Sequence, residues 1–145
     1  QKGMYSYPDF FVICGEATFH DEYQDVITNP TVIFEVLSPS TENYDRGEKF
    51  FRYLNWSSSL KDYVLISQTS PTVEHFSRQR DESWTYRVHQ GLETSVTLKS
   101  IKCTLKLADI YDRVQFLAEK PARKRSTKKA AKKKSTATVK EKKKR

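Results

Sequence analysis

The sequence predicts a single α+β domain built on a mixed β-sheet, and three observations indicate this. Val32–Leu37 is a run of six residues with a single charge, between Asn29-Pro30 and Ser38-Pro39, which is typical of a strand covered on both faces. The apolar period then changes from two residues to about 3.6, as in a helix. From Asp62 onwards apolar and polar residues alternate, as in an antiparallel meander with one wet face.

The expected elements follow in chain order. Pro8 suits the entrance of a first strand, because its fixed φ and missing N–H are tolerated there. The acidic stretch 15–29 is expected to be a loop. The predicted strands and helices are Phe10–Cys14, Val32–Leu37, a helix over 43–55, strands at Asp62–Ser67, Thr72–Ser77, Trp84–Val88, Ser95–Leu98 and Cys103–Leu105, and a short helix over Leu107–Tyr111.

The helix over 43–55 is predicted from its spacing. Residues three and four positions apart mark one face, which contains Tyr44, Gly47, Phe51 and Leu54. A neighbouring polar stripe contains Asp45, Lys49, Arg52 and Trp56. The aromatic residues of this helix are expected to belong mainly to the core, and they are Phe50, Phe51, Tyr53 and Trp56.

The charge distribution divides the chain into two parts. Residues 120–145 hold 14 Lys/Arg against one acid, whereas residues 1–119 hold 12 basic and 17 acidic side chains. We expect residues 1–118 to form one domain, N-terminally truncated because ordered-looking sequence begins abruptly. Residues 119–145 are expected to form a disordered basic tail, because they contain too little apolar surface to order.

Composition also excludes several classes of protein. No stretch approaches the ~18 apolar residues of a membrane span, and the start of the chain has no signal-peptide core. Cys14 and Cys103 fit neither a CxxC metal motif nor a disulfide framework. The sequence therefore predicts a soluble, cytoplasmic protein with no membrane partner, in which both thiols are reduced and buried.

The tail predicts nonspecific DNA binding, because flexible lysines neutralise phosphates without reading bases. The alternative is a solvated charge run that aids solubility. Its Lys-Lys-Ala-Ala-Lys-Lys-Lys segment is similar to the tails of histone-like proteins, which implies association with a bacterial nucleoid. The expected DNA-binding residues are Lys124, Arg125, Lys128, Lys129, Lys132, Lys133 and Lys134.

A carboxylate within an apolar strand is the main functional signal. An unpaired buried carboxylate is costly, so Glu35 needs a metal ion, a cation or its own proton. Asp9, at the mouth of the first strand, lies beside Glu35 if the two strands pair. Two acids followed by a lysine suit metal-assisted phosphodiester hydrolysis, with Mg²⁺ or Mn²⁺ as the ion.

Five segments of the sequence form a distinctive combination, namely Tyr-Pro-Asp9, Asn-Pro-Thr-Val-Ile-Phe-Glu35-Val-Leu-Ser-Pro-Ser-Thr, Tyr-Asp45-Arg-Gly-Glu-Lys49-Phe, Tyr63-Val-Leu-Ile-Ser-Gln68 and Leu107-Ala-Asp-Ile-Tyr111. Together they resemble the Uma family of restriction endonuclease-like proteins. The resemblance runs from about Tyr5 to Val114. It implies a PD-(D/E)XK nuclease fold, a divalent metal, a DNA substrate and the option of a homodimer. Family members usually carry a further N-terminal helix and strands.

By position, the resemblance implies that Asp9 is the first metal-binding acid and Glu35 the acid of the (D/E)XK half-motif. Leu37 stands where the standard motif has lysine. Lys49 on the following helix is the residue placed to replace it and to assist the attacking water. The first hypothesis is therefore a metal-dependent DNA endonuclease. The second is a catalytically inactive DNA-binding module with a degenerate nuclease fold.

Each residue also has a structural alternative. Asp9 could cap a turn, and Asp45 could form a surface ion pair with Lys49, four residues later. Glu35 could pair with Arg46 or Arg52 instead of a metal. Asp62 and Tyr63 are expected to be structural. The three histidines share no ligand spacing and are expected to be ordinary surface or half-buried residues, namely His20, His75 and His89.

Overall fold

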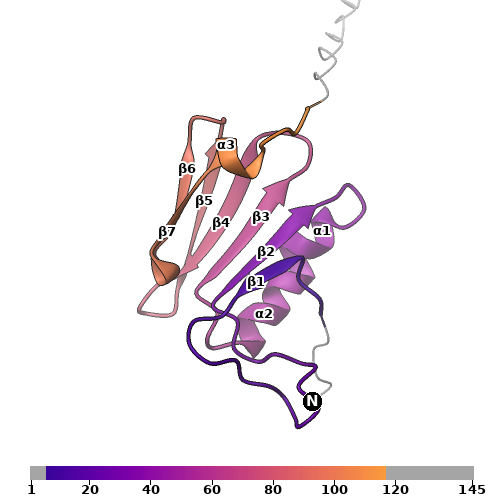
Figure 1. Cartoon of the computed structure of the whole chain (residues 1–145), viewed down its shortest axis with the longest axis vertical. Coiled ribbons are helices and arrows are strands. Elements are labelled where there is room, and N and C mark those ends of the chain that lie inside the picture. Colours follow the sequence, from indigo (N-terminus) through magenta and orange to yellow (C-terminus); the bar gives the residue numbers. More distant parts are fainter. Residues whose placement is uncertain (1–5, 117–145) are drawn as a thin grey trace, which may run out of the picture.

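The structure, a computed structural model, describes residues 6–116 (Figure 1). A five-stranded sheet has the order β1-β2-β3-β4-β5, and a separate two-stranded sheet pairs β6 with β7. The strands are β1 (Phe10–Val12), β2 (Val32–Leu37), β3 (Asp62–Ser67), β4 (Thr72–Arg78), β5 (Trp84–Gln90), β6 (Ser95–Leu98) and β7 (Cys103–Lys106). This confirms the mixed α+β class. The seven predicted DNA-binding residues of the tail lie outside the described residues.

The centre of the large sheet is the pair β2–β3, which is parallel, whereas the pairs β1–β2, β3–β4 and β4–β5 are antiparallel. Parallel neighbours need a crossover connection. The crossover here is helical, with α1 (Glu42–Tyr44), the π-helical turn η1 (Asp45–Lys49) and α2 (Phe50–Trp56) in succession. The last elements are the 3₁₀ turn η2 (Lys99–Ile101) and α3 (Leu107–Ile110).

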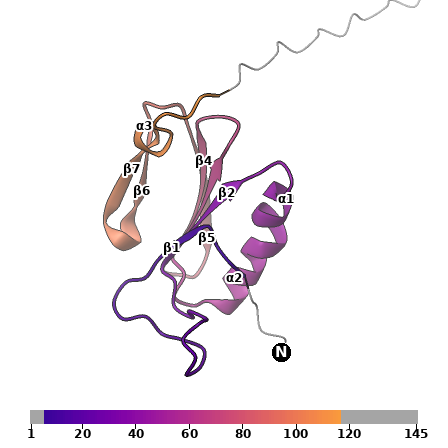
Figure 2. The ribbon, with the colours of Figure 1, turned by 45° about the vertical axis from the view of Figure 1, so that its right-hand side comes forward.

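The molecule has three layers (Figure 2). The helical crossover covers one face of the large sheet, and the β6–β7 hairpin with α3 covers the other. Each face carries its own hydrophobic core. The helix-side core contains Ile33, Leu37, Tyr53, Leu60, Tyr63 and Leu65, and the hairpin-side core contains Val32, Phe34, Val64, Val73, Val96, Leu98, Leu107 and Tyr111.

These two cores explain the continuous apolar run of β2. Successive side chains of a strand point to opposite faces, so Val32 and Phe34 enter the hairpin-side core while Ile33 and Leu37 enter the helix-side core. Glu35 has the same parity as Ile33 and therefore faces the helix. The prediction of a strand buried on both faces is confirmed at these positions.

The helix exposes a different face from the one that the spacing indicated. Phe51 and Tyr44 of the predicted face are 68% and 42% exposed, while the buried residues are Asp45, Lys49 and Tyr53. A π-helical turn holds more residues than an α-helical turn, so η1 shifts the register that a constant period of 3.6 assumes. Asp45 and Lys49 of the predicted polar stripe are thus on the side of the helix that packs against the sheet. The prediction that Phe51 belongs to the core is wrong.

Two strand predictions need correction. β1 ends at Val12, because the chain turns there and the amide of Cys14 donates to the hydroxyl of Thr31 (3.1 Å) instead of continuing the ladder. β6 does not extend the meander but leaves the large sheet to pair with β7. The break follows Gly91, whose φ of +89° is the left-handed conformation that glycine adopts without strain.

The two cysteines are both free, as predicted, but neither is fully buried. Cys14 is exposed beyond the end of β1, and Cys103 is half-buried at the start of β7. The prediction of buried thiols is therefore wrong, because these positions lie at strand ends and not in either core.

Candidate functional site

Glu35 lies in the middle of β2 and is 2% exposed. Its neighbour in β3 is Leu65, and the helix-side core surrounds both positions. One of its oxygens, Oε1, makes no hydrogen bond of normal geometry within the described part of the chain. A carboxylate in this apolar position therefore depends on the charges that the helical crossover brings to it.

The charge that reaches Glu35 comes from Lys49. Its Nζ lies 2.7 Å from Oε1 of Glu35 and 3.4 Å from Oδ1 of Asp45, and it donates to the backbone carbonyl of Tyr7 at 3.3 Å. The Lys49 side chain is 10% exposed, so this is a buried ion network. The predicted ion pair between Asp45 and Lys49 does form, but both residues are buried, so its expected place at the surface is wrong.

Asp9 approaches the site from β1. The antiparallel register pairs Phe10 with Phe34, so one step further Asp9 stands opposite Glu35. Asp9 is exposed, and its Oδ2 accepts the backbone N–H of Val36 at 2.7 Å. The structure thus brings together Asp9, which directly precedes β1, Glu35 of β2 and Lys49 of η1.

The electrostatics of the site place the titration of Glu35 near neutral pH. Burial raises the pKa of Glu35 to about 7, against the lowering effect of Lys49, and the carboxylates of Asp45 and Asp9 raise it further. Burial alone would lower the pKa of Lys49, but the Glu35 carboxylate outweighs burial and raises it. A perturbed carboxyl beside a lysine is a common property of functional sites.

The arginine alternatives for Glu35 are not realised. Arg46 forms ion pairs with Glu42 and with Glu74, and Arg52 pairs with Glu48. Arg46 is thus held by its own helix and by Glu74 of β4, and Arg52 by its own helix. Lys49 remains the cation at Glu35.

Sequence reasoning missed two features of the molecule. Asp45 is buried and shares Lys49, and its backbone carbonyl accepts the hydroxyl of Tyr63 (2.9 Å). His75 is 6% exposed, with Nε2 2.7 Å from Oδ1 of Asp62. The expectation of a surface or half-buried position for His75 is wrong. The signal for Asp45 was its place four residues before Lys49; nothing in the sequence linked Asp62 to His75.

The oxygen donors at this site fit a hard divalent cation. Asp9 and Glu35 offer two carboxylates, and Oε1 of Glu35 has the Lys49 ammonium as its charged neighbour, at 2.7 Å. Within residues 6–116 no group of three or more His, Cys, Asp or Glu side chains stands ready to hold a metal. This is compatible with Mg²⁺, which keeps several waters and commonly uses one or two carboxylates together with substrate phosphates.

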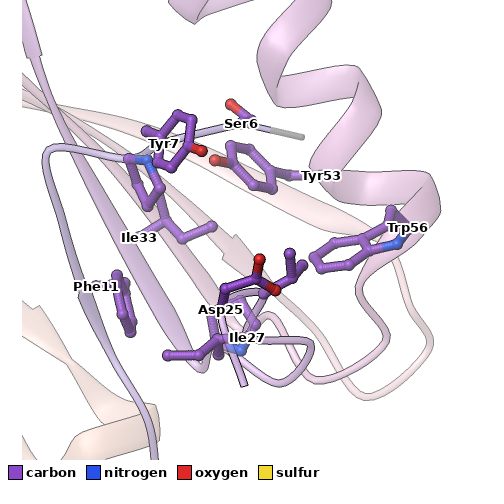
Figure 3. Close-up of a pocket in the computed structure, with 11 residues that line it drawn as sticks. Ser6, Tyr7, Phe11, Asp25, Ile27, Ile33, Tyr53 and Trp56 are labelled. Carbon is purple, nitrogen blue, oxygen red and sulfur yellow. The ribbon is translucent and has the colours of Figure 1, made fainter. Parts of the chain in front are cut away.

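A cavity of about 320 Å³ adjoins this site. Its walls include Ile33, two residues before Glu35, and Tyr53, four residues after Lys49. Figure 3 shows Tyr53 and Trp56 of α2 facing Phe11 and Ile27 across it. The cavity is mainly apolar, and Asp25 is the one acid among the described residues that line it. Residues of the loop 13–31 form its other wall.

The mixed sheet and its helical crossover define an α+β domain, with one acid just before β1 and another within β2. Residues 2–108 match the model of the family described as "Uma2: Putative restriction endonuclease". The chain belongs to this family, which confirms the resemblance seen in the sequence. Within residues 6–116 no helix is long and apolar enough to cross a membrane.

Two relatives come from Synechocystis sp. The uncharacterized protein sll1609 is 36% identical over 102 residues, and the uncharacterized protein slr1290 is 36% identical over 112 residues. These alignments cover 70% and 77% of this chain but only 57% of each relative. A crystal structure described as "a putative nuclease belonging to DUF820", from Anabaena variabilis, is 18% identical with a TM-score of 0.48, covering 63% of this chain and 51% of that chain.

Proposed function

We propose that this protein is a metal-dependent endonuclease that hydrolyses phosphodiester bonds in DNA. The observation that carries the proposal is the buried carboxylate of Glu35, held between Lys49 and the facing Asp9 in a chain of the Uma2 family. Burying an acid and a lysine together is costly for a fold. A catalytic use of both groups accounts for their retention.

Asp9 and Glu35 are the residues that would hold the metal. Mg²⁺ or Mn²⁺ would polarise the phosphate and acidify the attacking water. Glu35 binds a cation only as a carboxylate, so its pKa of about 7 places the change from proton to metal near neutral pH. Asp9, which is exposed, forms the solvent side of the site.

Lys49 takes the place of the lysine that the half-motif lacks at Leu37. Its ammonium reaches the Glu35 carboxylate from the helix, and the carbonyl of Tyr7 and the carboxylate of Asp45 hold it there. A cation fixed in this way orients the attacking water and stabilises the negative charge that develops on the phosphate. The 14 basic residues beyond position 119 would add nonspecific affinity for the DNA backbone.

The test is nicking of a supercoiled plasmid with Mg²⁺ or Mn²⁺ by the wild type, Glu35→Gln, Asp9→Asn and Lys49→Met. Loss of a preorganised charged group from a catalytic site reduces the rate on the order of a hundredfold or more. We expect losses of this size in all three variants. Mn²⁺ titration should show lost metal affinity in Glu35→Gln and Asp9→Asn but not in Lys49→Met.

Glu48→Gln is the matched control, because Glu48 lies in the same turn as Lys49 but pairs only with Arg52 at the surface. It should cleave at the wild-type rate. Equal nicking by the wild type and Glu35→Gln would show a contaminating nuclease. Metal binding without cleavage by the wild type would contradict catalysis and leave the DNA-binding module as the function.

A further inference from the structure

A second polar region lies on the opposite face of the sheet from Glu35. It is a cleft of about 880 Å³ between β3–β5 and the β6–η2 segment. Asp62 and Val64 have the same parity along β3, and Val64 belongs to the hairpin-side core, so Asp62 faces away from the helical crossover. The cleft and the Glu35 site are therefore two separate places on the molecule.

The cleft concentrates positive charge on an acidic body. Residues 6–116 contain 11 Lys/Arg and 16 Asp/Glu. The lining includes five of these cations but one acid, Asp62. The five cations are Lys61, Arg78, Arg80, Arg87 and Lys99. The cleft is therefore a positively charged surface on a domain whose net charge is negative.

The one acid of the cleft is buried and bound by its neighbours. Asp62 is 3% exposed, and its two oxygens interact with Nε2 of His75 and the hydroxyl of Ser100. His75 itself lies close to His89, with ring centroids 6.3 Å apart. The Nε2 atom of His89 is buried and has no hydrogen-bond partner among the described residues. The floor of the cleft thus offers polar groups and no competing anion.

Four of the cations have no ion pair within residues 6–116, namely Lys61, Arg80, Arg87 and Lys99, and all four are exposed. Arg78 pairs with Glu82 at 3.5 Å and lies 5.9 Å from the centroid of the Trp84 ring. Arg78 is therefore held by groups of the protein itself, whereas the other four cations remain available to a ligand. A ligand with several negative charges, such as a chain of phosphates, is the kind that a group of free cations in one cleft binds.

We propose that this cleft binds the phosphate backbone of a DNA strand, as a second contact surface independent of the metal site and of the tail. The inference rests on the proposed function only in the choice of DNA as the ligand. The contact carries no sequence information, because lysines and arginines on phosphates position a nucleic acid without reading its bases.

Cys14 makes the proposal testable, since this exposed thiol lines the cleft whereas Cys103 does not. In the Cys103→Ala protein, alkylation of Cys14 by neutral iodoacetamide reports occupancy of the cleft. The assay is run in EDTA, so cleavage plays no part. We expect an oligonucleotide to slow the alkylation severalfold, whereas inorganic phosphate at the same phosphate concentration leaves it unchanged.

Arg87→Gln with Lys99→Gln removes two charges from the cleft, and the matched control, Arg52→Gln with Lys106→Gln, removes two exposed charges outside it. With ~0.9 counterions released per phosphate contact, the cleft variant should lower the salt slope of binding by ~2 and abolish protection of Cys14. The control should keep both. Equal changes in the two variants, or alkylation that DNA never slows, would overturn the proposal.

Glu35→Gln separates this result from the proposed function. It should bind DNA and protect Cys14 like the wild type. If the wild type fails to cleave but the cleft variant still loses protection, the nuclease proposal fails while the cleft proposal stands. If a cleft variant cleaves at the wild-type rate with unchanged affinity, the cleft proposal fails while the nuclease proposal stands.

Discussion

At the scale of single residues, Glu35 is held by a balance between burial and Lys49. Its pKa of about 7 in the folded protein exceeds the ordinary 4.5. The folded state therefore binds this proton more tightly than the unfolded state does. The stabilisation is complete below about pH 4.5 and is lost as the pH rises through 7. Lys49 limits this loss, because its ammonium lies against the carboxylate.

Lys49→Met should therefore destabilise the protein in a pH-dependent way. Removing one partner of a buried pair costs ~3–5 kcal/mol, because the other charge stays buried. Without the ammonium the pKa of Glu35 rises further, so at pH 8 the folded protein must either bury an unpaired carboxylate or take up a proton, whereas at pH 5.5 Glu35 is already protonated. Urea unfolding should show a larger loss at pH 8 than at pH 5.5.

The control for this prediction is the double variant Glu35→Gln with Lys49→Met, in which the pair is replaced by uncharged side chains of similar size. It should lose less free energy of unfolding at pH 8 than Lys49→Met alone. Equal destabilisation of the single variant at both pH values would show that Lys49 acts through its packing and not through its charge.

At the scale of elements, the sequence predicted the bounds of strands better than it predicted which side of the helix is buried. β2, β3 and β6 have the predicted bounds, because apolar or alternating runs between turn residues define them locally. The helix was found but its buried side was not, since the π-helical turn η1 depends on the contacts of Asp45 and Lys49 with the sheet. The partners Asp9 and Glu35 were predictable because strand pairing places them opposite each other.

Gly47 in η1 offers a test of this element. A Cβ there would meet nothing within 4 Å, and the residue is exposed. Alanine loses less backbone entropy than glycine in a helix, so Gly47→Ala should stabilise the protein by ~0.5–1 kcal/mol. Metal affinity should not change, because the contacts of Lys49 remain.

Gly91→Ala is the contrasting variant, because Gly91 has a φ of +89° and a Cβ there would clash with the Glu93 carboxylate. It should destabilise the protein, by ~1 kcal/mol or more. Urea unfolding of both variants gives the comparison. Destabilisation by Gly47→Ala would show that η1 has a conformation that alanine does not tolerate.

At the scale of the whole molecule, the sheet separates two cores and two candidate functional surfaces. The Glu35 site lies on the helix side, and the basic cleft lies on the hairpin side. The first could be predicted from the sequence, because Glu35 and Lys49 stand in one strand-to-helix segment and Asp9 precedes the strand that pairs with Glu35's strand. The second could not, since its lining runs from Cys14 to Ser100 and only the packing of the β6–β7 hairpin brings these residues together.

Because the two cores are separate, we expect a destabilising substitution in one core to leave the site on the other face of the sheet intact. Leu98 and Leu65 are both fully buried, Leu98 in the hairpin-side core next to Lys99 and Leu65 in the helix-side core opposite Glu35. Each change to alanine should cost ~2–5 kcal/mol of stability. Because partial collapse around a cavity is local, Leu98→Ala should weaken protection of Cys14 by DNA while keeping Mn²⁺ affinity. Leu65→Ala should do the reverse. Protection of Cys14 and Mn²⁺ affinity are measured well below the unfolding temperature of each variant. Loss of both properties in either variant would show that the two faces of the sheet are coupled.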